Sequence, residues 1–124
     1  TKAMIKRRIQ VHGANVLVMG LTFKENCPDV RNTKVVDILS ELAEYEINVD
    51  VYDPWVNPEE AQLEYGVSLI EEPKKANYDA VIFAVAHKQF KEMSKAEIDV
   101  LVKDEHIIYD LKYMLDQSWV DLRL

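Results

Sequence analysis

Short apolar runs recur along the chain and alternate with segments whose apolar residues have a helical spacing. The runs at residues 16–19 and 79–86 are nearly free of polar residues. Such runs are typical of parallel strands that are covered on both faces of a sheet. Residues 47–53, 67–70 and 106–111 predict three further strands, bounded by glycine, proline or charged residues.

Helix start signals stand between these runs. Asn32 or Thr33 can cap a helix whose apolar residues then fall on one face through residue 42. Asn57-Pro58-Glu59-Glu60 combines a capping residue, a proline at the first helical position and acidic residues in the first turn, and Gly66 ends that helix. Residues 94–97 form a capping box ahead of Ile98, Leu101 and Val102.

Strands that alternate with helices at this spacing predict an α/β fold. We expect a Rossmann-like three-layer sandwich with a mainly parallel sheet of about five strands. Because crossover connections are right-handed, the loops that follow the strands meet at one edge of the sheet. Ligands of such folds bind at that carboxyl edge.

Composition narrows the functional classes. The 124 residues carry a net charge of −7, which disfavours a nucleic-acid partner. The basic cluster Lys6-Arg7-Arg8 lies in an amphipathic helix predicted over residues 2–12. No run approaches the length of a membrane span and no signal peptide is visible, so we expect a cytoplasmic protein. One cysteine offers neither a disulfide framework nor zinc-site spacing, and we expect no metal.

The most informative polar segment is the loop after the first strand, which carries Lys24, Asn26 and Arg31. An ammonium, a guanidinium and the following helix N-terminus suit a phosphate group. The same residues also fit a solvated loop with two surface cations. Cys27 lies between these charges and is either a nucleophile of lowered pKa or an incidental cysteine beside a turn proline.

Two other strand ends carry candidate groups. Asp53 follows the second strand, where a dinucleotide fold has its ribose-binding acid, but the first turn lacks G-x-G-x-x-G. Turn chemistry of the Asp-Pro pair is the alternative. His87 ends the central strand and is either an acid, base or phosphate ligand, or a plain polar strand end.

Residues 20–33 read G-L-T-F-K-E-N-C-P-D-V-R-N-T. This segment resembles the G-L-x-F-K-x-x-x-x-D-x-R-x-S/T signature of the UDP-glucose/GDP-mannose dehydrogenases, which opens their C-terminal nucleotide-sugar-binding domain. The resemblance continues at residues 51–54, 79–90 and 109–112 and covers the chain from about Gly13 to Leu115. It is closest to the branch that oxidises UDP-N-acetylhexosamines for surface polysaccharides.

The resemblance implies a parent enzyme with an N-terminal NAD domain, a central dimer-forming region and this C-terminal domain. Such an enzyme oxidises the C6 alcohol of a UDP-sugar to a carboxylate in two hydride transfers, through a thiohemiacetal on a cysteine of the central region. Cys27 is not that cysteine. We therefore expect residues 1–124 to be a single domain, with residues 1–12 as its opening helix, excised from a dehydrogenase that forms a homodimer or larger assembly. The domain alone should hold no catalytic residue and be inactive.

By the same resemblance, Phe23 and Lys24 contact the UDP-sugar, and Arg31 reaches NAD, which is bound mainly by the missing domain. Asn26 is a further substrate contact. Lys112 stands where some relatives have a substrate-binding arginine. Two other classes remain open: a free-standing nucleotide-binding or regulatory module, and an interaction domain that uses the basic helix.

Overall fold

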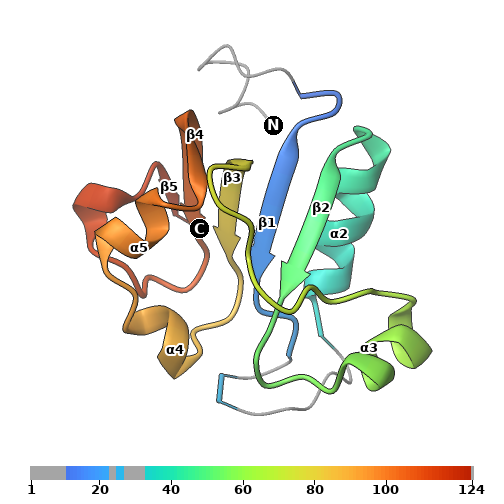
Figure 1. Ribbon diagram of the computed structural model, residues 1–124. Coiled ribbons are helices and arrows are strands. Elements are labelled where there is room, and N and C mark those ends of the chain that lie inside the picture. The colour runs from blue at the N-terminus through green and yellow to red at the C-terminus, as the bar shows by residue number, and fades with distance from the viewer. Residues whose placement is uncertain (1–10, 23–24, 27–32, 124) are drawn as a thin grey trace.

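A parallel sheet forms the middle layer of the computed structural model, which describes residues 11–22, 25–26 and 33–123 (Figure 1). Its strands lie in the order β2-β1-β3-β4-β5, and every pairing is parallel. The strands are β1 (Asn15–Met19), β2 (Asn48–Tyr52), β3 (Tyr78–Phe83), β4 (Val102–Asp110) and the two-residue β5 (Leu122–Arg123). The sheet therefore has four full strands and a short strand at one edge.

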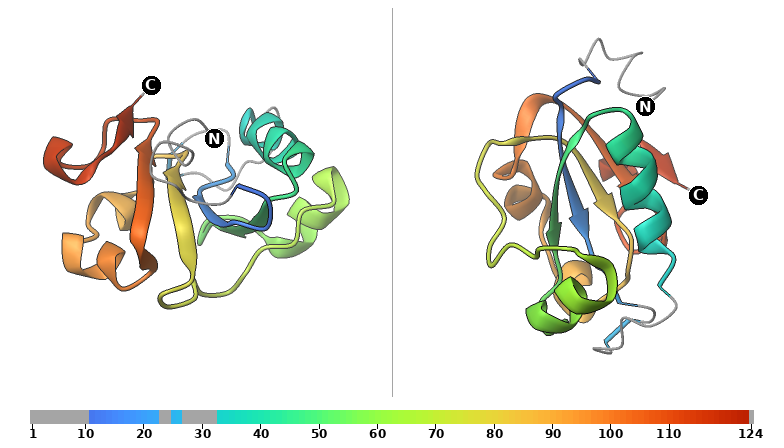
Figure 2. Two further views of the ribbon diagram at one scale, coloured as in Figure 1. Left: turned by 90° about the horizontal axis from the view of Figure 1, so that it is seen from above. Right: turned by 90° about the vertical axis from the view of Figure 1, so that its right-hand side faces the viewer.

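Helices lie on both faces of this sheet (Figure 2). They are α2 (Val35–Glu44), α3 (Pro58–Tyr65), α4 (Lys88–Lys91), α5 (Lys95–Asp99) and the 3₁₀ turn η1 (Gln117–Trp119). The helices α2 and α3 pack in one apolar cluster, and α4, α5 and η1 pack in the other. The predicted α/β fold, a mainly parallel sheet between layers of helices, is confirmed.

The central strand β1 shows why its sequence is continuously apolar. Val16 and Val18 belong to the cluster on the α2 face, whereas Leu17 and Met19 belong to the cluster on the α4 and α5 face. All four residues are buried. A strand buried on both faces has no position for a polar side chain, which is the pattern that the sequence shows.

Local capping chemistry sets most helix starts. Asn57 accepts a hydrogen bond from the Glu59 amide at 2.8 Å, with Pro58 as the first helical residue. Ser94 and Glu97 form the predicted capping box of α5. Thr33 Oγ1 accepts from the Val35 amide at 3.2 Å at the start of α2. The predicted caps at Asn57 and Ser94 are confirmed, whereas the N-cap of α2 is Lys34, which makes no side-chain cap bond, rather than Thr33.

The prediction of a strand at residues 67–70 is wrong. This segment makes only an isolated bridge between Leu69 and Val51, supported by the Ile70 amide bonding the Val51 carbonyl at 2.9 Å. Two glutamates and Pro73 follow at once, and proline has no amide hydrogen to continue a ladder. The apolar residues of the segment still pack against the core beside β2.

Two strand boundaries also differ from the prediction. The strand β3 ends at Phe83 rather than at residue 86, because the amides of Ala84 and Val85 both turn to the Met19 carbonyl. The strand β4 begins at Val102, which was expected to lie on the preceding helix; α5 ends earlier, at Asp99. Of the helix predicted over residues 2–12, residues 2–10 lie outside the described part of the chain.

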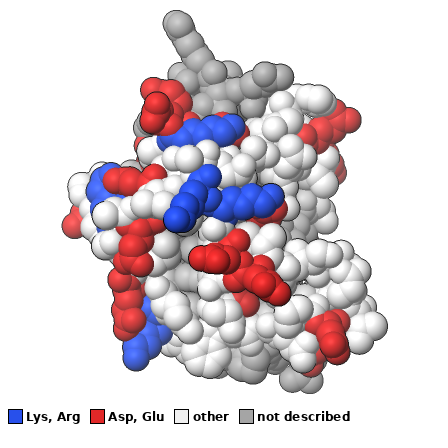
Figure 3. All heavy atoms as spheres, viewed as in Figure 1, with Lys and Arg blue, Asp and Glu red and all other residues white. Residues whose placement is uncertain are grey.

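Lysines and arginines lie among acidic side chains on the face seen in Figure 3. Ion pairs among the described residues include Lys103 with Asp79 at 3.2 Å and Lys74 with Asp50 at 3.7 Å. No helix within the described residues has the length and apolar character needed to cross a membrane.

Candidate functional site

The carboxyl ends of β1, β2 and β3 meet at one edge of the sheet, the lower edge in Figure 1. The segments that follow them carry the polar residues singled out above: residues 20–26 after β1, Asp53 after β2 and His87 after β3. Since β1 lies between β2 and β3, both Asp53 and His87 can reach the loop that leaves β1.

Asp53 is the centre of this edge and is only 5% exposed. Its Oδ2 accepts hydrogen bonds from the amides of Leu21 at 2.8 Å and Thr22 at 3.2 Å, and lies 2.9 Å from His87 Nε2. Its Oδ1 accepts from the Trp55 amide at 2.8 Å. Burial raises the pKa of this carboxyl, but the hydrogen bonds from His87 and the backbone outweigh it and hold the pKa below its usual value.

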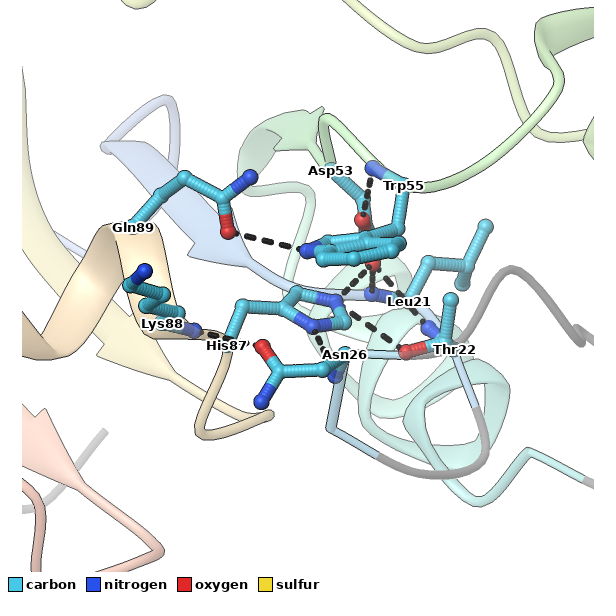
Figure 4. A network of polar contacts seen from close by, with 8 residues as sticks. All are labelled: Leu21, Thr22, Asn26, Asp53, Trp55, His87, Lys88 and Gln89. Atoms are coloured by element: carbon cyan, nitrogen blue, oxygen red, sulfur yellow. Dashed lines mark hydrogen bonds and ion pairs between the residues drawn. The ribbon is translucent and has the colours of Figure 1, made fainter.

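His87 is fully buried and is bonded at both ring nitrogens (Figure 4). Nδ1 lies 2.8 Å from the backbone nitrogen of Asn26, which can only donate, so Nδ1 is the acceptor. Nε2 therefore carries the proton of the neutral ring and donates to Asp53 Oδ2 at 2.9 Å, with Thr22 Oγ1 at 3.1 Å. The hydrogen-bond network assigns this tautomer.

Aromatic rings enclose the imidazole. Trp55 stacks against His87 with 5.9 Å between ring centroids, and Phe90 meets it edge-on at 5.4 Å. The Trp55 indole is itself held by a 2.8 Å bond from Nε1 to Gln89 Oε1. These contacts leave the ring little freedom to rotate and exclude solvent from the pair that it forms with Asp53.

Asn26 joins this network through both its backbone and its side chain. Its φ of 54° lies in the left-handed region, which asparagine tolerates better than most residues. Its Oδ1 accepts from the Lys88 amide at 2.7 Å, at the first residue of α4. The Asn26 side-chain carbonyl is thus already bonded to the backbone, and the expected substrate contact of this residue stays a prediction.

The start of the loop is equally constrained. Gly20 has a φ of 109°, and a Cβ built there would lie 2.6 Å from the Val85 Cβ. The Gly20 amide donates to the Tyr52 carbonyl at 2.9 Å. Only glycine allows this approach of the β1 and β3 chains without strain.

The network is not a nucleophilic triad. In such triads the nucleophile and the acid contact opposite nitrogens of the histidine. Here Thr22 and Asp53 both contact His87 Nε2, and Nδ1 is bonded to the backbone of Asn26. A buried pair of this geometry orders the chain around it and has no access to a substrate.

The described part of the first turn does not fit a dinucleotide either. The amides of Leu21 and Thr22, which would face a pyrophosphate in a dinucleotide fold, donate to Asp53. The Asp53 carboxylate points inward and does not face a ribose. The turn interpretation of Asp53 is supported, because its Oδ1 accepts from Trp55 two residues later.

Lys112 lies apart from this cluster. It follows β4, and its amide donates to Asp110 Oδ1 at 3.1 Å. Its exposed side chain lines a groove of about 540 Å³ between α2 and the sheet, with Lys34 and Leu111. Phe23, Lys24, Cys27 and Arg31 lie outside the described residues.

Sequence reasoning identified Asp53 and His87 singly but missed that they bond each other, and missed Trp55 altogether. The available signal was topological: both residues lie in the segments that follow the strands flanking β1. No group of three or more histidine, cysteine, aspartate or glutamate residues with metal-binding geometry occurs among residues 11–22, 25–26 and 33–123.

Comparisons with known proteins identify the family. Residues 17–117 match the family model described as the UDP-glucose/GDP-mannose dehydrogenase family, UDP binding domain. The chain is 62% identical over 123 residues to a UDP-N-acetyl-D-glucosamine 6-dehydrogenase of Pseudomonas aeruginosa and 51% identical to one of Salmonella typhi. It matches 99% of its own length but spans only 29% of each relative.

Solved structures agree on the fold. An NDP-N-acetyl-D-galactosaminuronic acid dehydrogenase from Methanosarcina mazei superposes with a TM-score of 0.81 at 19% identity, over 94% of this chain and 24% of that one. A UDP-D-ManNAc dehydrogenase from Pyrococcus horikoshii gives a TM-score of 0.78 at 21% identity, over 98% of this chain and 28% of that one. The chain therefore belongs to the UDP-glucose/GDP-mannose dehydrogenase family, as its loop motif predicted.

Proposed function

We propose that this chain is the UDP-sugar-binding domain of an NAD-dependent nucleotide-sugar 6-dehydrogenase. The enzyme oxidises the C6 alcohol of a UDP-sugar to the uronate in two hydride transfers. The observation that carries the proposal is the 62% identity, over 99% of the chain, to a UDP-N-acetyl-D-glucosamine 6-dehydrogenase. That relative and the second at 51% favour a UDP-N-acetylhexosamine over UDP-glucose as the substrate.

The proposed ligand contacts are Phe23, Lys24, Asn26 and Lys112 for the UDP-sugar and Arg31 for the cofactor. Cationic groups can neutralise the diphosphate in a chain whose overall charge of −7 would otherwise repel it. Because the Asn26 carbonyl is bonded to Lys88, a ligand contact from this residue would use its amide nitrogen. Lys112 is exposed and therefore accessible to a ligand.

In this proposal NAD is held mainly by another domain of the parent chain. NAD would accept the two hydrides, and the described first turn offers it no pyrophosphate site, because Asp53 occupies the amides. The full-length protein would contain N-terminal and central domains and assemble as a homodimer or larger oligomer. Residues 1–124 form one domain that does not turn over substrate alone.

Calorimetric titration of the chain with UDP, UDP-N-acetylglucosamine and NAD tests the proposal. We expect weak binding of both uridine nucleotides, no measurable NAD binding and no NADH production. Lys24→Ala should abolish uridine-nucleotide binding. Lys95→Ala is the matched control, because it removes the same charge from α5, where Lys95 pairs with Asp99.

Each alternative class gives a different outcome. A free-standing regulatory module would prefer a nucleotide without uridine. An interaction domain would bind none of the three ligands at millimolar concentration. Equal loss of uridine binding in Lys24→Ala and Lys95→Ala would contradict the assigned role of Lys24.

A further inference from the structure

We infer that His87 is a positioning residue for the ligand loop, which its neutral imidazole fixes by bonding Asp53 with one nitrogen and the Asn26 amide with the other. The ligand loop is defined here as residues 20–22 and 25–26, the part of the segment after β1 that the structure describes. This role rests on the proposed function, because the proposed UDP-sugar contacts Phe23 and Lys24 stand between these residues in the sequence.

In the sequence, the two attachments stand on either side of Phe23 and Lys24. On the N-terminal side, Asp53 Oδ2 holds the amides of Leu21 and Thr22 at 2.8 and 3.2 Å. On the C-terminal side, His87 Nδ1 holds the Asn26 amide at 2.8 Å. Three residues, 23–25, join these fixed points. Asp53 thus holds Leu21 and Thr22 directly, and His87 holds Asn26, so each partner fixes one described end of the loop.

The two partners of His87 require a side chain that donates one hydrogen bond and accepts another. The Asp53 carboxylate needs a donor, and the Asn26 amide needs an acceptor. Neutral imidazole provides both within one rigid ring, whereas imidazolium provides two donors and would leave the Asn26 amide without an acceptor. Full burial and the stacked Trp55 ring keep each nitrogen facing its own partner.

Two substitutions at His87 each remove one of its two hydrogen bonds and keep the other. In His87→Asn, the side-chain oxygen replaces Nδ1 and can still accept from Asn26, but nothing reaches Asp53. In His87→Gln, the longer amide can still donate to Asp53, but no acceptor remains for Asn26. The bond to the carboxylate is charge-assisted and stronger, so His87→Asn should lose more stability in urea denaturation.

Ligand affinity should follow the opposite order. We expect His87→Asn to bind UDP-N-acetylglucosamine within about threefold of the unchanged chain and His87→Gln to bind about tenfold more weakly, the factor of one lost hydrogen bond. A purely structural role would make affinity follow stability, so weaker binding by His87→Asn than by His87→Gln, or equal binding, overturns the inference.

Two measurements need no bound ligand. Two-bond ¹H–¹⁵N correlation in the unchanged chain should show His87 with an unprotonated Nδ1; a protonated Nδ1 overturns the inference even if neither variant folds. Hydrogen exchange at the Asn26 amide should be faster in His87→Gln than in His87→Asn, and equal rates overturn it as well. If the unchanged chain binds no uridine nucleotide, the proposed function fails, while these two results still decide whether His87 positions the loop.

Discussion

Each end of the sheet has a buried aspartate that bonds neighbouring segments, and the two aspartates bond different parts of the chain. Near the amino ends of the strands, Asp79 Oδ2 accepts hydrogen bonds from the Asn15 amide at 2.8 Å and from Lys103 Nζ at 3.2 Å. These residues lie near the starts of β3, β1 and β4, so Asp79 links three neighbouring strands. At the carboxyl ends, Asp53 accepts two amides of the ligand loop and pairs with His87.

The difference separates stability from function. Bonds among strand residues reinforce pairings that the sheet already makes. The bonds of Asp53 and His87 fix a loop that leaves the sheet and has no ladder of its own. Substitutions at the amino end should therefore change stability alone, whereas substitutions at the carboxyl end should change both stability and the affinity for a uridine nucleotide.

Asp53→Asn should have the largest effect. It leaves the donors of Leu21, Thr22 and His87 competing for one neutral oxygen. Each hydrogen bond to the buried carboxylate contributes about 1.5–3 kcal/mol to the unfolding free energy, and all three are weakened together. Binding of UDP-N-acetylglucosamine should be lost. Asp79→Asn is the control, with a cost of about 1 kcal/mol because its carboxylate bonds one amide and a half-exposed lysine.

The pH dependence of the same variant gives a second readout. The pKa of Asp53 is lowered in the folded chain, so its stabilising contribution is present above the unfolded value of about 4 and is lost as pH falls through the folded value. Urea denaturation between about pH 7 and pH 3 should show this loss in the unchanged chain and not in Asp53→Asn. Equal loss of ligand affinity in Asp53→Asn and Asp79→Asn would contradict the comparison.

The two glycines that flank β1 extend the comparison between the two ends of the sheet. Gly20→Ala at the carboxyl end should cost about 3 kcal/mol, because it combines a φ of 109° with a 2.6 Å approach to the Val85 Cβ. Gly13→Ala at the amino end has a φ of 78° but nothing within 4 Å of its Cβ, so it should cost about 1 kcal/mol. Thermal and urea unfolding measure both; equal costs would show that the contact with Val85 is relieved.

These networks also show what the sequence can predict. Capping signals such as Asn57-Pro58 and Ser94 with Glu97 act within one helical turn, so they were predicted correctly. The motif of residues 20–33 identified the family because it is long and contiguous. The strand predicted at residues 67–70 failed because apolar character does not reveal whether a partner edge is available along its whole length.

The site was only partly predictable for the same reason. Asp53 and His87 are 34 positions apart, and their bond depends on both flanking strands ending level with β1. Either residue alone fits an ordinary strand end. The bond from the Lys88 amide to Asn26, 62 positions away, is likewise invisible in the local sequence, and the role of Asn26 as a ligand contact stays a prediction.

Tyr78→Phe tests the amino end with a smaller change. Tyr78 is buried, and its hydroxyl donates to Asp50 Oδ2 at 2.7 Å and accepts from the Lys74 amide at 3.2 Å. Loss of these bonds should cost about 1 kcal/mol and leave uridine binding unchanged. Burial, aided by the bond to Asp50 and opposed by the bond from Lys74, raises the pKa of Tyr78 to about 12.

The raised pKa of Tyr78 makes stability depend on pH in the alkaline range. A raised folded pKa means that the stabilising contribution is complete below the unfolded value of about 10 and declines as pH rises toward the folded value. The unchanged chain should therefore lose stability between about pH 10 and 12, and Tyr78→Phe should lose less over that range. A variant with the same alkaline decline would show that another group causes it.

Lys103→Gln should have the smallest effect. The Lys103 ammonium lies 3.2 Å from Asp79 Oδ2, but its side chain is 45% exposed, and such pairs contribute less than about 1 kcal/mol. Salt screens exposed pairs much more than buried ones. The loss of unfolding free energy caused by Lys103→Gln should therefore shrink toward zero at high salt. The loss caused by Asp53→Asn should stay nearly constant, because Asp53 and His87 are buried and shielded from dissolved salt. If the unfolding free energy lost in Asp53→Asn also falls as salt is added, water reaches the Asp53–His87 pair. The ligand loop would then be held less firmly than its hydrogen bonds indicate.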